Sequence, residues 1–274
     1  MNRLLWRAFR IGLVLTAVSI AVFPFYWTLR TAVAAPDSVF FKGISLLPDE
    51  LALDNFTKAW RQADLGEAML NGALMTVTIL VCQLLTCVPA AYAFAKLRFR
   101  GRNVLYGLVL ACLLVPTQAT AIPLYLGIGS VGLGNTWLAL VLPFTTSAFG
   151  IFLLRQYMVT IPDTLLEAAR TDGLGTFSTL RRVVVPMSAP AIATFSVFSI
   201  FVHWNDYLWP LLVARDESLR TPPLALATFQ QADTGLDYGA LSAGAVIITA
   251  PIVVLFLIAQ RRFVAGIAGG EIPG

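Results

Sequence analysis

The residues best placed to do chemistry lie in a polar stretch between two long apolar segments. This stretch contains Glu167-Ala168-Ala169, then Asp172 and Gly173, and Pro186 further along. A carboxylate beside two alanines can offer a charge-assisted hydrogen bond on a surface that another protein approaches closely. Asp163 is expected to cap the helix that carries these residues, and Gly173 to end it in a left-handed conformation. We therefore predict a short helix, a tight turn and a second helix that runs towards Pro186.

A second group of residues combines aromatic faces with hydrogen-bonding groups. Trp204, Asn205 and Asp206 follow one another at the end of an apolar run, and Gln118 lies in another apolar run. Carbohydrate sites use such combinations, so these four residues are predicted to line a substrate pathway. Trp and Tyr are also enriched at the membrane–water interface, and a polar residue such as Gln118 also bonds neighbouring helices. The sequence leaves both interpretations open.

No catalytic residue or metal site is predicted. The three cysteines lie in apolar segments and the chain has a single histidine, which is too few for a metal site. A P-loop needs glycines followed by Lys and Ser or Thr, and none of the three lysines has that context. An intramembrane enzyme would need a nucleophile or metal constellation that is not evident. We predict that the chain is not an enzyme and holds no cofactor.

The elements that position these residues are membrane helices. Of the 274 residues, 58% are hydrophobic and 12% are charged, whereas soluble domains have about 25% charged residues. The uncharged run 103–154 is too long for one span, and its middle, 127–135, is rich in glycine. We predict an all-α polytopic membrane protein, a single transmembrane domain over residues 1–274. Its six helices are expected at about 11–29, 70–95, 104–125, 136–154, 189–212 and 239–260, with a loop at about 160–186.

Basic residues predict the orientation of these helices. With six spans, 13 of the 19 Lys and Arg residues fall on the side that holds both termini and the loop 160–186. The positive-inside rule places that side in the cytoplasm. The tract 96–102 contributes four of these residues; a nucleic-acid patch is the rival interpretation, but the position between two spans favours topology. The first apolar stretch, 11–29, is longer than the core of a secretory signal, which indicates an uncleaved helix.

The loop resembles the coupling motif of bacterial ABC importer permeases. That motif is Glu-Ala-Ala, three residues, Gly, nine residues, then Ile, any residue, Leu and Pro, and the chain differs only by Val183 and Val185. Segments 90–102, 204–210 and 243–263 are also similar to carbohydrate permeases. The resemblance covers nearly the whole chain and is closest to the shorter permease of maltose- and glycerol-phosphate-type systems. It implies a type I ABC importer permease fold, although the tail, 268–274, departs from the family pattern.

The resemblance implies a role and a set of partners. Glu167, Ala168, Ala169, Asp172, Gly173 and Pro186 would couple the chain to an ATPase dimer, which would bind ATP and Mg²⁺. A homologous second permease and an extracytoplasmic solute-binding protein would complete a sugar importer, surrounded by lipid in the bacterial cytoplasmic (inner) membrane; nucleic acid is not expected. Which sugar or polyol is carried is not implied.

Two alternatives remain open at this point. An ion-coupled secondary transporter usually carries titratable groups inside its spans, and the five long apolar runs contain no Asp, Glu, Lys or Arg. Sodium sites built from carbonyl groups are still compatible with the sequence. An ABC permease for a solute other than a sugar is the second alternative.

Overall fold

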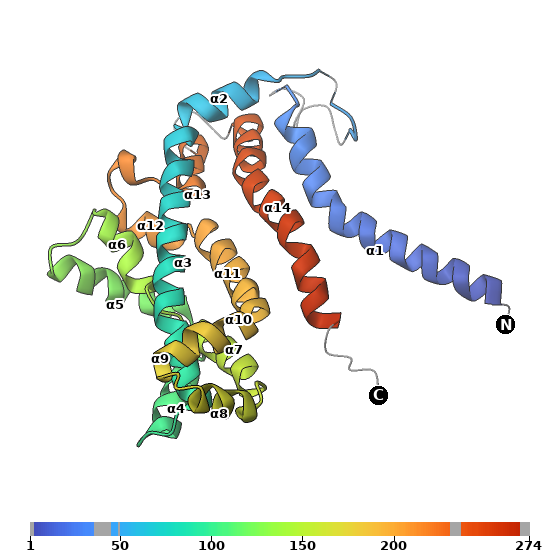
Figure 1. The fold of residues 1–274 in the computed structure, drawn as a ribbon. Helices are drawn as coiled ribbons and strands as arrows, with labels where there is room; N and C mark the ends of the chain where they lie inside the picture. Colours follow the sequence, from blue (N-terminus) through green and yellow to red (C-terminus); the bar gives the residue numbers. More distant parts are fainter. Residues whose placement is uncertain (1–2, 36–44, 49, 231–236, 269–274) are drawn as a thin grey trace. The chain divides into compact units, whose positions relative to one another are not determined.

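The computed structural model describes residues 3–35, 45–48, 50–230 and 237–268, and the elements named within these ranges are helices (Figure 1). The chain forms two compact units. One contains residues 1–66 and 225–251, and the other contains residues 67–224 and 252–274. The residues with predicted functions all belong to the second unit.

The first unit holds its connections together through a buried asparagine. Asn55, at the start of α2, is 1% exposed, and its Nδ2 donates to the carbonyl oxygens of Ala32 (3.1 Å) and Ala34 (2.9 Å). Gly239 lies so close that a Cβ there would stand 2.7 Å from the same Nδ2. Asn55 thereby joins the end of α1 to α2. The elements of this unit are α1 (Arg3–Ala32), α2 (Asp54–Gln62), η5 (Leu226–Gln230) and the first part of α14 (Tyr238–Ala268).

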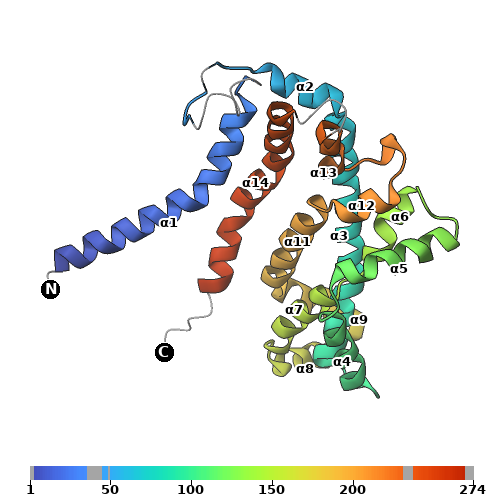
Figure 2. The same cartoon turned by 180° about the vertical axis from the view of Figure 1, so that it is seen from behind.

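The second unit is built around the long helix α3 (Leu65–Lys96), which runs along its length in both views (Figures 1 and 2). Side chains of Thr136 and Ser147 cap the helices that follow them by accepting from backbone N–H groups at 3.2 and 3.1 Å. The other elements, in chain order, are α4 (Arg102–Cys112), α5 (Thr117–Ser130), α6 (Trp137–Val141), η2 (Leu142–Phe144), α7 (Ala148–Val159), α8 (Asp163–Thr171), α9 (Thr176–Thr179), η3 (Leu180–Val184), α10 (Val185–Met187), α11 (Ala189–Trp204), α12 (Leu208–Val213), η4 (Glu217–Leu219), α13 (Pro222–Ala225) and the second part of α14, from Ile252.

Two apolar clusters form the core of the second unit. One packs α3 against α7, α8 and α11, with Leu154, Met158, Val184 and Phe195 almost fully buried. The other packs a different stretch of α3 against α5, α6 and α12, around residues such as Ile79. The first cluster supports the predicted coupling loop, and the second supports the predicted substrate-pathway residues.

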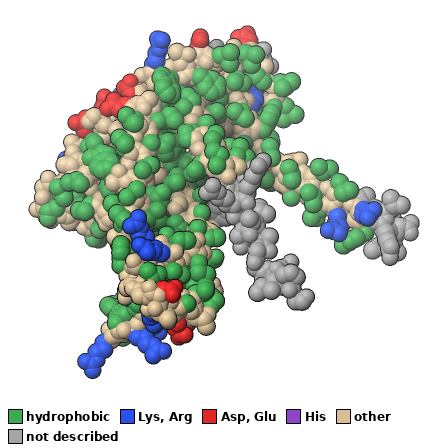
Figure 3. Space-filling view, in the orientation of Figure 1, with side chains coloured by type: hydrophobic (Ala, Val, Ile, Leu, Met, Phe, Trp, Pro, Cys, Tyr) green, Lys and Arg blue, Asp and Glu red, His purple; other side chains and the backbone are tan. Residues whose placement is uncertain are grey.

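The predicted all-α membrane fold is confirmed. Within the described parts of the chain, four helices are long and apolar enough to span a bilayer, at Phe9–Ala32, Leu65–Lys96, Trp137–Val159 and Tyr238–Ile258. Two bent helix pairs pass the same test, so the number of candidate spans is six if each pair counts as one. Apolar side chains cover most of the visible surface (Figure 3), as expected of a protein whose solvent is lipid.

The helix predicted at 104–125 is wrong as a continuous element. α4 ends at Cys112 and α5 begins at Thr117, with a bend of 99° between them, and α5 then continues through the glycine-rich stretch to Ser130. Pro116 has no N–H to donate, and a proline disfavours helical backbone at the residue before it. A proline in the interior of a helix therefore costs about 3 kcal/mol. A helical glycine costs only about 1 kcal/mol, so α5 continues past Gly127 and Gly129. The break predicted in the glycine-rich stretch falls at 131–136, between α5 and α6, where Gly132 has a left-handed φ of +73°.

The helix predicted at 189–212 is also interrupted. α11 ends at Trp204, where Asn205 Nδ2 donates to the carbonyl oxygen of Phe201 at 2.7 Å. Asp206 Oδ1 then accepts from the backbone N–H of Trp209 at 3.2 Å and caps α12. Asn and Asp compete with helical bonding in this way because their short side chains reach nearby backbone groups. The predicted span 136–154 similarly contains three short pieces, α6, η2 and α7, and extends to Val159.

Candidate functional site

The predicted coupling helix is present as α8 and ends as its sequence predicts. Gly173 has a φ of +80°, a left-handed conformation that favours glycine. Its N–H donates to the carbonyl oxygen of Arg170 at 3.0 Å, and the N–H of Leu174 donates to that of Ala169, also at 3.0 Å. This pair of bonds is the Schellman motif, which satisfies the last carbonyl groups of a helix. The chain then turns into α9.

One face of α8 is buried in the chain and the other is free. Leu166 and Ala169 are 3% and 5% exposed, whereas Glu167, Ala168 and Asp172 are exposed. Ala168 therefore remains available to a partner. The interpretation of Ala169 as a partner-contacting residue is corrected, because its small side chain allows α8 to approach the core of its own chain. Phe177, on α9, is 75% exposed and extends the free surface; no sequence pattern had indicated it.

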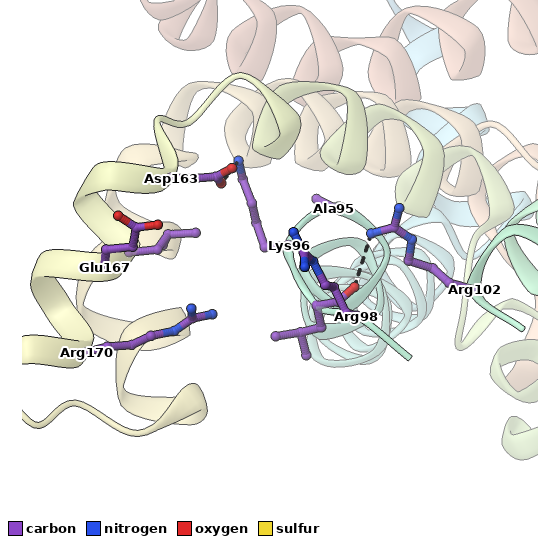
Figure 4. Close-up of a pocket in the computed structure, with 9 residues that line it drawn as sticks. Ala95, Lys96, Arg98, Arg102, Asp163, Glu167 and Arg170 are labelled. Carbon is purple, nitrogen blue, oxygen red and sulfur yellow. Dashed lines mark hydrogen bonds and ion pairs between the residues drawn. The ribbon is translucent and has the colours of Figure 1, made fainter. Parts of the chain in front are cut away.

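A buried ammonium group ties α8 to the end of α3. The Lys96 side chain is 6% exposed, and its Nζ donates to the carbonyl oxygens of Val159 (3.2 Å) and Ile161 (2.6 Å) and to Asp163 Oδ1 (2.8 Å). Figure 4 shows Lys96 reaching from α3 towards Asp163 on α8. Three donors meet three acceptors, so the ammonium group is fully satisfied. The hydrogen bond and positive charge of Lys96 lower the pKa of the Asp163 carboxyl below its usual value.

Further cations gather around the same end of α3. Arg102 donates to the carbonyl oxygen of Leu97 at 3.2 Å, and Arg155 donates to that of Phe94 at 3.3 Å. The Arg155 guanidinium also lies over the Tyr106 ring, 4.0 Å from its centroid. Cations at a helix C-terminus are favourable because the last carbonyl groups carry partial negative charge. Figure 3 shows the basic side chains clustered at the end of this unit that carries α4 and α8.

A cavity of about 570 Å³ lies between α8 and the end of α3. Glu167 and Arg170 face it from α8, while Arg98 and Arg102 face it from the other side (Figure 4). The exposed carboxylate of Glu167 is thus bordered by cations of its own chain. A partner that binds Glu167 would have to approach from the open side of α8.

The segment that follows the coupling helix leads directly into a membrane helix. The π-helical segment η3 precedes Pro186, and the helix 176–187 meets α11 at a bend of 78°. Pro186 cannot donate a backbone hydrogen bond, so the regular helical ladder is broken just before it. Pro186 is therefore placed at the joint between the loop and α11.

The predicted pathway residues are only partly brought together. Gln118 and Asp206 line one cavity of about 200 Å³, here called the His203 pocket. Trp204 is 7% exposed and does not line it, and Asn205 caps its own helix. The residues that line the pocket are Thr117, Gln118, Thr120, Ala121, Leu124, Phe144, Val202, His203, Asp206, Leu208 and Trp209.

Several of these pocket residues could not be found by inspecting the sequence. Phe144 enters from η2, and its ring lies 5.1 Å from the His203 ring and edge-on to Trp209 at 5.9 Å. Trp209 is held by a hydrogen bond from its Nε1 to the carbonyl oxygen of Ala139, at 2.9 Å. The aromatic residues near Trp204 are the sequence signal for this pocket, but only the fold shows which aromatic rings line it. Among the described residues, no group of three or more His, Cys, Asp or Glu could hold a metal ion.

Comparison with known proteins identifies the family. Residues 87–269 match the family described as the binding-protein-dependent transport system inner membrane component. The chain is 35% identical to a probable ABC transporter permease, YurM, of Bacillus subtilis, over 92% of this chain and 84% of that protein. It is 33% identical to AraQ, the arabinooligosaccharide transport permease of Halalkalibacterium halodurans, over 93% and 92% of the two chains. The chain belongs to this family of ABC importer permeases.

A solved structure supports the same fold for this permease. A bacterial ABC transporter that imports the acidic polysaccharide alginate contains a chain that superimposes with a TM-score of 0.85 at 23% identity, covering 96% of this chain and 99% of that one. Membership of the family places the chain in the inner membrane as a binding-protein-dependent permease and not an enzyme. It also decides against the ion-coupled alternative.

Proposed function

We propose that this chain is one of two permease subunits of an ATP-driven importer of carbohydrates or related polyols, and that it forms half of the translocation pathway. The arabinooligosaccharide permease AraQ and the trehalose permease SugB of Mycobacterium tuberculosis, 32% identical over 94% of each chain, support the cargo class. A solute-binding protein would deliver the cargo, and a homologous second permease would complete the pathway. Both termini would lie in the cytoplasm.

The observation that carries the coupling proposal is that α8 has one exposed face while its other face is held against its own chain. Glu167, Ala168 and Asp172 are exposed, while Leu166 packs into the core and Lys96 clamps the start of the helix. An ATPase subunit, which would hold ATP and Mg²⁺, would bind this face. Movement of the ATPase dimer would then shift α8 and α3 together as a rigid body. The joint at Pro186 would transmit this shift to α11.

Cross-linking of the assembled transporter tests this contact. Ala168→Cys is introduced in a background where the exposed Cys112 is replaced by Ser, and single cysteines are scanned along the ATPase surface. A disulfide between Ala168→Cys and the ATPase is expected, whereas Gly134→Cys, at an exposed position between α5 and α6 with nothing within 4 Å of a Cβ, is expected to give none. Absence of any Ala168→Cys product, or ATP-independent solute uptake, would contradict the proposal.

Two substitutions at the end of α8 separate coupling from assembly. Gly173→Val forces a β-branched residue into the left-handed conformation, whereas Gly173→Asn is much better tolerated there. No atom lies within 4 Å of a Cβ at this position, so the backbone conformation and not a clash is tested. We expect Gly173→Val to reduce solute uptake per ATP hydrolysed and Gly173→Asn to retain most of it. Equal ratios in both variants would count against the rigid-turn mechanism.

A further inference from the structure

The His203 pocket has a hydrogen-bonding pattern that can be worked out from one glutamine. Gln83, on α3, is 3% exposed, and its Oε1 accepts from Ser199 Oγ at 2.7 Å. Its Nε2 lies 3.0 Å from the carbonyl oxygen of Phe144 and 3.2 Å from His203 Nε2. A carbonyl oxygen can only accept, so the amide nitrogen of Gln83 must face Phe144. The orientation of this amide is therefore determined by its partners.

The orientation of Gln83 determines the tautomer of His203. An amide nitrogen has two hydrogens; one is donated to Phe144 and the other points at His203 Nε2. His203 Nε2 must accept that hydrogen, so it carries no proton itself. A neutral imidazole with an acceptor at Nε2 has its proton at Nδ1. His203 is thus held as a neutral ring whose Nδ1–H is a donor without a partner among the described residues.

The remaining lining of the pocket has no positive charge. The described residues that line it include no Lys or Arg, and Asp206 is the one acidic residue among them. Gln118, Thr117 and Thr120 supply uncharged hydrogen-bonding groups, while Phe144 and Trp209 supply aromatic faces. The volume of about 200 Å³ is below the roughly 300–1,000 Å³ of sites for drug-sized ligands, so the pocket suits one ring of a larger solute.

We propose that the His203 pocket contacts the transported solute and favours an uncharged polyhydroxylated compound over an anionic one. The inference rests on the proposed import function. His203 Nδ1–H donates to a hydroxyl oxygen of the solute, and the carboxylate of Asp206 accepts from a second hydroxyl. A phosphate or uronate group would meet this carboxylate with no cation of this pocket to balance it. The pocket thereby differs in chemistry from what an acidic polysaccharide or a phosphorylated polyol requires.

Two substitutions distinguish a solute-binding role of His203 from a structural one. His203→Gln keeps an acceptor near the Nε2 position for Gln83 but removes the donor near Nδ1. His203→Asn keeps a donor near Nδ1 but removes the contact with Gln83. If His203 binds solute, His203→Gln should raise the half-saturating concentration for uptake by about two- to tenfold, the effect of one lost hydrogen bond, and His203→Asn should shift it less. A purely structural role predicts the reverse order.

The experiment uses the complete transporter with its binding protein in proteoliposomes. The probes are maltose, trehalose and glycerol as uncharged solutes, and glycerol 3-phosphate and galacturonate as anionic ones. ATP-dependent uptake of an uncharged probe, weakened more by His203→Gln than by His203→Asn, supports the inference. ATP-dependent uptake of the anionic probes alone, or a larger effect of His203→Asn, overturns it while leaving the import function intact. Uptake that does not require ATP would instead overturn the import function.

Discussion

Replacing Lys96 by Met tests whether the coupling helix is clamped to α3. Methionine keeps the length and apolar stem of the side chain but removes the ammonium group that bonds the carbonyl oxygens of Val159 and Ile161. Hydrogen bonds to a charged group contribute roughly 1.5–3 kcal/mol, and an acceptor left unpaired in a buried position costs roughly 1–3 kcal/mol. Relief of the cost of burying the ammonium group offsets part of this loss.

The hydrogen bond to Val159 is the longer one and is solvent-exposed, so it contributes less than the 2.6 Å hydrogen bond to Ile161. We therefore expect Lys96→Met to lower the free energy that holds α8 against α3 by about 1–3 kcal/mol. Such a loss multiplies the population of undocked α8 by about 5- to 150-fold. The assay is amide hydrogen exchange over residues 163–173 in the assembled transporter, together with the ratio of solute imported to ATP hydrolysed. Lys96→Met should accelerate exchange in this segment and lower the ratio.

Two control variants make the result specific. Arg98→Met removes a cation from the same cavity, two residues away from Lys96, and should leave exchange in α8 close to the wild-type rate. Asp163→Asn removes the charge of the exposed partner but keeps an oxygen acceptor, so its effect should be smaller than that of Lys96→Met. If Lys96→Met leaves exchange at 163–173 unchanged, the clamp does not hold α8 and the reasoning is refuted.

Three further predictions concern pH and packing. Lys96 lowers the pKa of Asp163, so their pairing stabilises the folded state above the usual pKa of an aspartate and is lost only as pH falls through the lowered pKa. The rate of amide hydrogen exchange in α8, corrected for intrinsic rates, should therefore be constant from about pH 8 to pH 5. Asn55→Leu leaves two carbonyl groups without their donor, and should lower the free energy of unfolding by roughly 1–3 kcal/mol, seen as a lower melting temperature of the purified complex. Gly150→Ala would place a Cβ 2.5 Å from the Phe195 ring and should cost roughly 1–3 kcal/mol in the same assay, while Gly107→Ala, with nothing within 4 Å, should not lower the melting temperature.

The coupling helix was predictable because its signals are local. The left-handed end at Gly173 follows from a glycine placed directly after a short helix, and the Schellman bonds confirm it. The burial of Ala169 was not predictable, since a single sequence does not say which side of an amphipathic helix meets its own chain. From the sequence, Lys96 indicates only the cytoplasmic side of the membrane, whereas in the structure it also binds the start of α8. This contact was not predictable because the acceptors of Lys96 lie 63 to 67 residues away in the sequence.

The interruptions of the membrane helices have local causes. The break predicted in the glycine-rich stretch 127–135 is present at 131–136, between α5 and α6, whereas the break before Pro116 is not predicted, although proline removes a donor and clashes with the preceding turn. At the end of α11, the sequence leaves Asn205 and Asp206 open between a substrate pathway and an aromatic membrane interface, and in the structure both bond backbone groups of adjacent helical turns. Asp206 also lines the His203 pocket, whereas Asn205 does not.

Two buried polar groups of the second unit, Lys96 and His203, can be compared by one physical rule. A buried polar group in a membrane protein is tolerated when each of its donors and acceptors has a partner. Lys96 obeys this rule completely, because three acceptors match its three donors, and such a group favours one fixed arrangement. His203 obeys it only on the Nε2 side, which leaves Nδ1–H for a ligand. The proposed coupling role of α8 requires a fixed helix, which the fully paired ammonium group of Lys96 provides. The proposed solute contact requires an open donor, which Nδ1–H of His203 provides.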